Sequence, residues 1–235
     1  MKLQYVTMTG ADESVDPKAL IELSKEFPFV EWGILIGSQS GMRFPSVKWI
    51  ENLLVASGEA PERIHLSLHI CGRWLRGIAA GRSDLDSAIC GIGAFDRCQL
   101  NWHGERQGNI GEKILAAFCN FPFWEPQIIF QMDGVNDLLW EPCGRKFFCG
   151  GLFDRSHGAG VLPDQWPQPL NEIQSGYAGG IGPDNIESEL QRISAVTDFR
   201  PIWIDMETKI RSDDGGTFDL SKVRWCLEKA APFAI

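Results

Sequence analysis

Three carboxylates stand directly after short apolar runs of this sequence. Asp133, Asp154 and Glu207 each follow such a run, and Lys209 comes two residues after Glu207. Carboxylates act as general acids and bases, and a desolvated lysine can clamp a charge or form a Schiff base. These residue types predict acid/base chemistry on a small molecule. A salt bridge from Lys209 to Glu207 or Asp205 is the alternative role for the lysine.

A glycine-rich stretch, GYAGGIGPDNI at residues 176–186, points to a ligand of a particular kind. Gly179 and Gly180 leave a short apolar run, and a segment with helical character begins at Pro183. Glycines let backbone N–H groups face a ligand without an intervening Cβ, and the first turn of a helix attracts anions. The stretch predicts a phosphate-binding loop, with a tight strand-to-helix turn as the alternative.

The elements that must position these residues alternate along the whole chain. We expect strands at 3–8, 32–36, 64–70, 98–102, 127–132, 150–153, 177–178 and 201–206. Helices are expected from Pro17 onward, with Asp16 as N-cap, and at 46–56, 73–80, 110–118, 183–196 and 220–230. Eight strand-then-helix units predict an α/β fold, a single (β/α)8 TIM barrel spanning residues 1–235. An open doubly wound sheet is the alternative.

In such a barrel the active site lies at the C-terminal ends of the strands. That end would also receive Thr9, Arg43, His69 and His103. His69 and His103 could bind a divalent metal together with Asp133 or Glu207, but no HxH or HxxxH spacing supports such a site. We therefore expect neither a metal nor another cofactor.

The composition of the chain indicates which kinds of molecule it can bind. The net charge of -9 and the pI near 5.0 argue against nucleic acid. No apolar run approaches a membrane span or a signal peptide, which predicts a cytoplasmic protein without a membrane partner. Seven scattered cysteines without a CxxC pair are typical of reduced thiols. No feature specifies an oligomeric state.

Motifs in the same order along nearly the whole chain resemble phosphoribosylanthranilate isomerase. AGGIGPDNI (178–186) resembles the family's AGGLxPxNV, QLNWHGE (99–105) resembles VQLHGDE, and LFDRSHGAGVLPDQW (152–166) is similar to LLDSxxGGTGxxFDW. SGMRFPS (40–46), VTMTGAD (6–12) and IDMETKIR…FDLSKV (204–223) stand where that family has SxRxVS, VKICGIT and VDVSSGVE…KDxxKI. The resemblance implies the same barrel fold.

The resemblance also implies roles for single residues. The family performs an Amadori rearrangement with an Asp after strand six as general acid, which matches Asp154, and a Cys after strand one as general base, which is Thr9 here. It implies phosphate contacts at Gly179 and Gly180, and Gly158 and Gly160 keep part of the family's glycine-rich loop six. It implies a carboxylate contact at Arg43. A threonine hydroxyl cannot replace a thiolate without an activator.

A second departure is Glu207-Thr208-Lys209 after strand eight, where the family has a Ser-Gly pair that helps to hold the phosphate. The two departures predict that the barrel is kept and the chemistry has changed. We expect an isomerase- or lyase-type enzyme acting on a small phosphorylated or sugar-like metabolite, with Asp154 as the principal acid/base group and Glu207, Asp133, Lys209 and Thr9 as further candidates. The substrate would contact Arg43, His69, His103 and the glycines. The alternatives are a true phosphoribosylanthranilate isomerase, a non-catalytic metabolite-binding barrel and a structural relative that acts through its surface.

Overall fold

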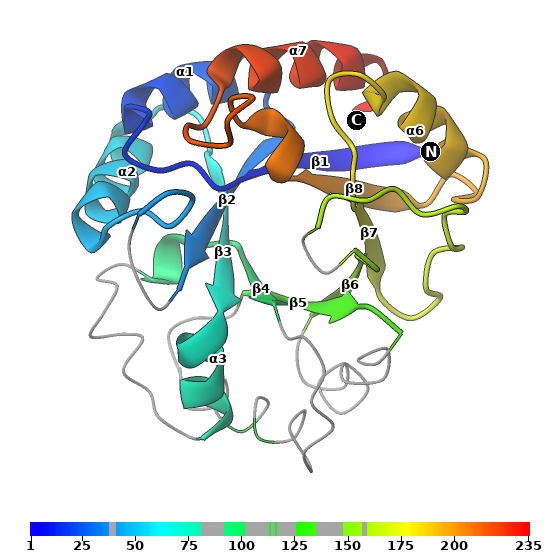
Figure 1. The fold of residues 1–235 in the computed structure, drawn as a ribbon, viewed down its shortest axis with the longest axis horizontal. Helices are drawn as coiled ribbons and strands as arrows, with labels where there is room; N and C mark the ends of the chain where they lie inside the picture. The colour runs from blue at the N-terminus through cyan, green and yellow to red at the C-terminus, as the bar shows by residue number, and fades with distance from the viewer. Residues whose placement is uncertain are drawn as a thin grey trace.

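Eight parallel strands, most of them buried along their length, form the centre of the protein. The computed structural model describes residues 1–37, 41–80, 92–101, 113, 116, 126–134, 148–156 and 159–235. The strands are β1 (Lys2–Thr9), β2 (Val30–Ile36), β3 (His65–Cys71), β4 (Arg97–Asn101), β5 (Gln127–Met132), β6 (Cys149–Phe153), β7 (Gln174–Ala178) and β8 (Pro201–Met206). Each pairs with the next, and β1 pairs with β8 (Figure 1). The (β/α)8 barrel is confirmed, and the alternative of an open sheet is wrong.

Helices lie outside the strands. They are α1 (Pro17–Glu26), α2 (Val47–Glu59), α3 (Gly72–Ala79), α6 (Ile186–Ser194) and α7 (Leu220–Ala230), with 3-10 turns η1 (Ile92–Ala94), η2 (Thr208–Ile210) and η3 (Ala231–Phe233). In Figure 1, α1, α2, α6 and α7 surround β1, β2 and β8. The expected helix at 110–118 lies outside the described residues, apart from residues 113 and 116. Within the described ranges, no helix has the length and apolar character needed to cross a membrane.

Local capping explains where two of these helices begin. Asp16 accepts a hydrogen bond from the backbone N–H of Lys18, and Pro17 occupies the first turn, as the sequence predicts. Ser46 accepts from the backbone N–H of Trp49 and starts α2 in the same way. These caps fix the two helices that follow β1 and β2.

The strands alternate between two packing environments. Outward side chains such as Val6 and Met8 belong to the main core beneath the helices. The inward side chains Ile129, Leu152, Ala178 and Trp203 form a smaller core inside the barrel. Trp203 fills space left by glycine, because a Cβ added to Gly176 would lie 2.1 Å from the indole. The barrel interior therefore contains an apolar plug built around one tryptophan.

Charged side chains lie inside the barrel beside this plug. Glu31 is 0% and Arg97 3% exposed, and Arg97 Nη1 lies 3.3 Å from Glu31 Oε2. Thr7 Oγ1 donates a 2.9 Å hydrogen bond to the same carboxylate, and the Arg97 guanidinium lies 4.2 Å from the ring centre of Trp203. Burial raises the pKa of Glu31, while Arg97 and Thr7 oppose that rise. The pair offsets only part of its desolvation cost.

Replacing Gly176 by alanine is expected to destabilise the barrel by about 1–3 kcal/mol, because the new methyl group overlaps the Trp203 ring. Urea unfolding of the variant and of the parent measures the difference. Gly58→Ala is the matched control, since a Cβ at Gly58 in α2 meets nothing within 4 Å. The control is expected to be neutral or to stabilise the protein. Equal stability of the Gly176 variant and the parent would contradict this account of the plug.

Candidate active site

A polar cavity of about 240 Å³ opens at the C-terminal end of the barrel. It is bordered by residues at or just beyond the C-terminal ends of β2 to β8. Its polar and charged side chains come from six different segments: Arg43, Cys71, Gln99, Asn101, Gln131, Asp154, Ser156, Asp205, Glu207, Thr208 and Lys209. The location is the one where TIM-barrel enzymes carry out their chemistry.

Asp154 lies in this cavity as a firmly oriented carboxylate. It directly follows β6 and is 7% exposed. Its Oδ2 accepts a 2.9 Å hydrogen bond from Gln131 Nε2, and its Oδ1 accepts from Ser156 Oγ at 2.7 Å and from the Ser156 backbone N–H at 3.0 Å. Three donors hold the carboxylate in one orientation toward the cavity. The sequence placed Asp154 after the sixth strand, and the structure shows the hydrogen bonds that orient its carboxylate.

Asp205 on β8 is a second buried carboxylate in the same cavity. It is 7% exposed, and its Oδ1 accepts a 2.7 Å hydrogen bond from Thr9 Oγ1. Burial raises the pKa of Asp205 to about 7; the nearby Glu207 adds to the rise and the Thr9 hydrogen bond opposes it. Such a group can both give and take a proton near neutral pH. Sequence reasoning considered Asp205 only as a salt-bridge partner.

Thr9 supports a carboxylate in this arrangement. The side chain is 1% exposed, and its hydroxyl proton points to Asp205. A carboxylate accepts protons far more readily than a threonine hydroxyl, so the proton acceptor of this pair is Asp205. Side chains alternate between the inside and the outside of the barrel along β8, so Asp205 points inward like Trp203 two residues before it. This alternation is the sequence signal that could have identified Asp205 as a residue of the cavity.

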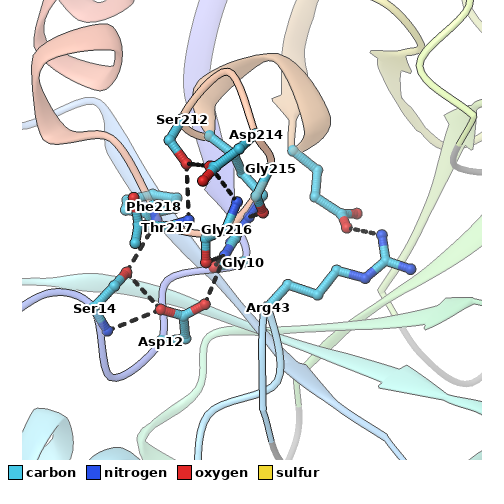
Figure 2. A network of polar contacts seen from close by, with 12 residues as sticks. Gly10, Asp12, Ser14, Arg43, Ser212, Asp214, Gly215, Gly216, Thr217 and Phe218 are labelled. Carbon is cyan, nitrogen blue, oxygen red and sulfur yellow. Dashed lines mark hydrogen bonds and ion pairs between the residues drawn. The ribbon is translucent and has the colours of Figure 1, made fainter.

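Glu207 is tied to Arg43 across the cavity mouth. Arg43 Nη1 lies 2.5 Å from Glu207 Oε1, and Figure 2 shows the arginine reaching toward β8 from the segment before α2. Burial raises the pKa of Glu207, and the Arg43 guanidinium opposes the rise. No ion pair between described residues includes Lys209, which lines the cavity from η2. The expected pairing of Lys209 with Glu207 or Asp205 is therefore wrong.

A buried ion pair fixes the loops after β1 and β8. Arg211 Nη2 lies 2.8 Å from Asp12 Oδ2, and both side chains are almost completely buried. Arg211 also donates to the backbone carbonyls of Gly10, Gly215 and Gly216. These four contacts of Arg211 fix the two loops, and Glu207 and Lys209 lie between the loops at the rim of the cavity. The sequence gives no signal for this pairing, because Asp12 and Arg211 lie at opposite ends of the chain.

The glycine pair allows two loops to cross closely. Gly179 and Gly180 have φ of 110° and 71°. A Cβ at Gly179 would lie 2.9 Å from the Val161 carbonyl oxygen, and a Cβ at Gly180 would lie 2.7 Å from the Leu162 nitrogen. The backbone after β6 therefore requires glycine here. Both glycines and Gly160, whose φ is 67°, also line the cavity.

The helix after these glycines begins later than the sequence suggests. The α6 helix starts at Ile186 instead of Pro183, because Asn185 closes a turn before it. Asn185 Nδ2 donates to the Gly180 carbonyl, and its Oδ1 accepts from the Gly182 N–H, both at 2.9 Å. The N–H groups of Gly182 and Ile186 are thus already satisfied within the turn. The tight-turn interpretation describes this backbone, and phosphate binding stays a prediction.

Other predicted residues lie apart from the cavity or outside the described residues. His69 is 1% exposed inside the barrel, with Nδ1 3.3 Å from Gln99 Nε2, and burial lowers its pKa to about 3, so it is neutral. Asp133 follows β5 and is 9% exposed, but it is not among the cavity-lining residues. His103 and Gly158 lie outside the described residues. In the described part of the chain, no three His, Cys, Asp or Glu side chains cluster as metal ligands.

Comparisons with known proteins bear on the fold. No protein-family model and no curated protein matches this sequence. A truncated 3-deoxy-D-arabino-heptulosonate 7-phosphate synthase from Thermotoga maritima is similar in structure, with a TM-score of 0.55 and 12% identity over 98% of this chain and 86% of that chain. A citrate lyase from Burkholderia xenovorans has a TM-score of 0.53 and 12% identity over 100% of this chain and 78% of that chain. Both similarities establish a TIM-barrel fold.

Replacing Asp205 by asparagine is expected to change how stability depends on pH. Because the folded state raises the pKa of Asp205 from 3.8 to about 7, it holds the proton more tightly than the unfolded chain. The contribution of Asp205 to the free energy of unfolding therefore falls as the pH rises from about 4 to about 7. Asp205→Asn removes this contribution and is expected to be more stable than the parent at pH 8 by about 1–4 kcal/mol.

Urea unfolding at pH 5 and pH 8 measures this difference. Glu228→Gln on the exposed side of α7 is the matched control, since it removes a carboxylate far from the cavity. The control is expected to leave the pH dependence of the parent in place. An Asp205→Asn profile parallel to that of the parent would contradict the assignment.

Proposed function

We propose that this protein is an isomerase- or lyase-type enzyme that transfers protons on a small sugar-like metabolite, with Asp154 and Asp205 as its acid/base groups. The observation that carries the proposal is the presence of these two buried carboxylates in one cavity with different surroundings. Gln131 and Ser156 donate three hydrogen bonds to Asp154, whereas Thr9 donates one to Asp205, whose pKa is raised by burial to about 7. Pairs of carboxylates in unlike environments commonly divide the acid and base roles.

The lining of the cavity supports a hydroxylated substrate. Gln99 and Asn101 on β4 and Gln131 on the adjacent β5 present amide groups to the cavity. Amides both donate and accept hydrogen bonds, as sugar hydroxyl groups do. The Oε1 of Gln131 is buried without a hydrogen-bond partner among the described residues, so it can accept from a substrate hydroxyl. The hydrogen bond from Gln131 to Asp154 already orients the Gln131 amide before a substrate enters the cavity.

The lysine Lys209 at one side of the cavity favours a substrate that carries a phosphate group. Lys209, Thr208 and Gly180 border both this cavity and a neighbouring one of about 480 Å³, which also contains Arg211 and Lys222. Arg211 and Lys222 are paired with Asp12 and Asp213, so Lys209 is the side chain best able to meet an added anion. Arg43 offsets the opposing charge of Glu207.

Similarity to phosphoribosylanthranilate isomerase supports Asp154 and the glycine pair in this scheme. The scheme departs from that family at Thr9, where the family has its cysteine base. Asp205, in contact with Thr9, would take the proton that the cysteine takes there. A non-catalytic metabolite-binding barrel is the second candidate, and the observation that favours it is the same replacement of the cysteine by threonine.

Replacing Asp154 by asparagine is expected to lower turnover by a factor of about 10²–10⁴, because the amide cannot transfer the proton. The assay incubates the protein in D₂O with sugar phosphates, free sugars and phosphoribosylanthranilate, and follows isomerisation, cleavage and deuterium uptake by mass spectrometry. Asp198→Asn is the control, since Asp198 is exposed on the turn before β8. Undiminished turnover in Asp154→Asn would rule out the proposed role. Binding by the parent without any product or exchange would favour the non-catalytic barrel.

Replacing Lys209 by alanine is expected to weaken the binding of sugar phosphates about 10- to 100-fold, the worth of one charge-assisted hydrogen bond. Binding of the matching unphosphorylated sugars is expected to stay within about twofold, because the lysine meets only the phosphate. Isothermal titration calorimetry compares both ligand series. Lys48→Ala, an exposed lysine on α2, is the control for a lost surface charge. An equal loss of affinity for the phosphorylated and the unphosphorylated sugars would contradict the proposed contact between Lys209 and the phosphate.

A further inference from the structure

Two positively charged side chains border the candidate active site among the residues that the structure describes. They are Arg43 and Lys209, and their surroundings differ. Arg43 Nη1 lies 2.5 Å from Glu207 Oε1, whereas Lys209 forms no ion pair with a described residue. The similarity to phosphoribosylanthranilate isomerase implies a ligand carboxylate on Arg43. The carboxylate that Arg43 meets here belongs to the chain itself.

Each partner of this ion pair stands on a hydrogen-bonded turn. Arg43 belongs to the turn 41–44, which two backbone hydrogen bonds between its first and last residues close at 2.7 and 3.2 Å. The guanidinium carbon lies 5.5 Å from the centre of the Phe44 ring. Glu207 directly precedes η2, and the Ile210 N–H donates to the Glu207 carbonyl at 3.3 Å. The protein therefore holds the two side chains together without help from a ligand.

Little space separates the ion pair from the backbone that follows β1. A Cβ added to Gly10 would lie 3.4 Å from Arg43 Cβ and 3.6 Å from Glu207 Cγ. Arg211 Nη1 donates a 2.8 Å hydrogen bond to the Gly10 carbonyl, so this stretch of backbone is itself fixed. The Glu207 side chain is only 23% exposed, against 46% for Arg43. Glu207 thus has little freedom to leave Arg43 for water.

A ligand anion at Arg43 would meet the charge of Glu207 in one of two ways. It would displace Glu207 and leave a mostly enclosed carboxylate without its partner, or it would share the guanidinium and bring two like charges together. Burial raises the pKa of Glu207 and Arg43 opposes the rise, so the ionised carboxylate depends on this arginine. Placing a like charge beside a site is an effective way to reject the wrong ligand.

We propose that Glu207 is a specificity-determining residue, which binds Arg43 and restricts the cavity to substrates with one anionic group. Lys209 receives that group, as in the function proposed above, on which this inference rests. The substrate class is thereby narrowed to hydroxylated phosphates that carry no carboxylate. Selectivity for a ligand carboxylate, which the family resemblance implies at Arg43, is replaced by selectivity against one.

Two open-chain ligands that differ in a single carboxylate provide the test. Sorbitol 6-phosphate and 6-phosphogluconate share their phosphate and their chain of hydroxyl groups, but the first ends in a hydroxymethyl group and the second in a carboxylate. Isothermal titration calorimetry measures the binding of each to the full chain. The parent is expected to bind sorbitol 6-phosphate at least about tenfold more tightly than 6-phosphogluconate, because Glu207 repels the second anion.

Breaking the ion pair from its two sides is expected to have different effects. Glu207→Gln frees Arg43 and is expected to tighten the binding of 6-phosphogluconate about 10- to 100-fold, the worth of one charge-assisted hydrogen bond. Arg43→Gln frees no guanidinium and is expected to bring no such gain. A purely structural role of the ion pair would make the two variants behave alike. Glu26→Gln, which breaks the exposed ion pair with Arg224, is the matched control and is expected to bind both ligands as the parent does.

The double variant Arg43→Gln, Glu207→Gln contains neither charge and is expected to lose the gain of Glu207→Gln. A parent that binds the two ligands equally or not at all would overturn the proposal. A Glu207→Gln variant without the gain, or a double variant that keeps it, would do the same. Failure of the proposed function looks different, since Asp154→Asn would then retain full turnover, or Lys209→Ala would bind sorbitol 6-phosphate as tightly as the parent.

Discussion

The pairing of β1 with β8 is the constraint on which both the fold and the candidate site depend. It closes the barrel and aligns Thr7 with Asp205 and Met8 with Met206. Two side-chain contacts follow from this closure, the Thr9–Asp205 hydrogen bond and the Asp12–Arg211 ion pair beside it. Closure also removes Asp205 from water, and this burial is the main cause of its pKa of about 7. The acid/base character of the cavity is therefore a consequence of how the two ends of the barrel sheet meet.

Several glycines of the chain are required by crowding within the protein itself. Gly176 makes room for the Trp203 indole, and Gly179 and Gly180 make room for the backbone at Val161 and Leu162. The glycine-rich stretch raised the expectation of a close approach to the backbone. A close approach does occur, and its partner in the structure is the loop after β6. Any phosphate would have to bind beside this crossing, where Lys209 stands.

The local features of the sequence predicted local structure well. Alternating apolar runs gave the eight strands, Asp16 and Pro17 marked the start of α1, and the position of Asp154 after β6 predicted its place at the cavity. Contacts between distant segments were not predictable in the same way. Arg43 with Glu207 and Asp12 with Arg211 join residues that are far apart in sequence, and no spacing rule encodes such partners. The pKa of Asp205 depends on the same closure, so residue type alone could not reveal it.

Trp203 has a consequence for how the two ends of the molecule communicate. With Ile129, Leu152 and Ala178 it forms an apolar layer inside the barrel. Asp205 borders the cavity at the C-terminal ends of the strands, and Arg97 and Pro201 border a second cavity of about 730 Å³ near their N-terminal ends. The strand β8 carries Pro201, Trp203 and Asp205 in turn. A displacement of this one strand would therefore move side chains at both ends of the barrel.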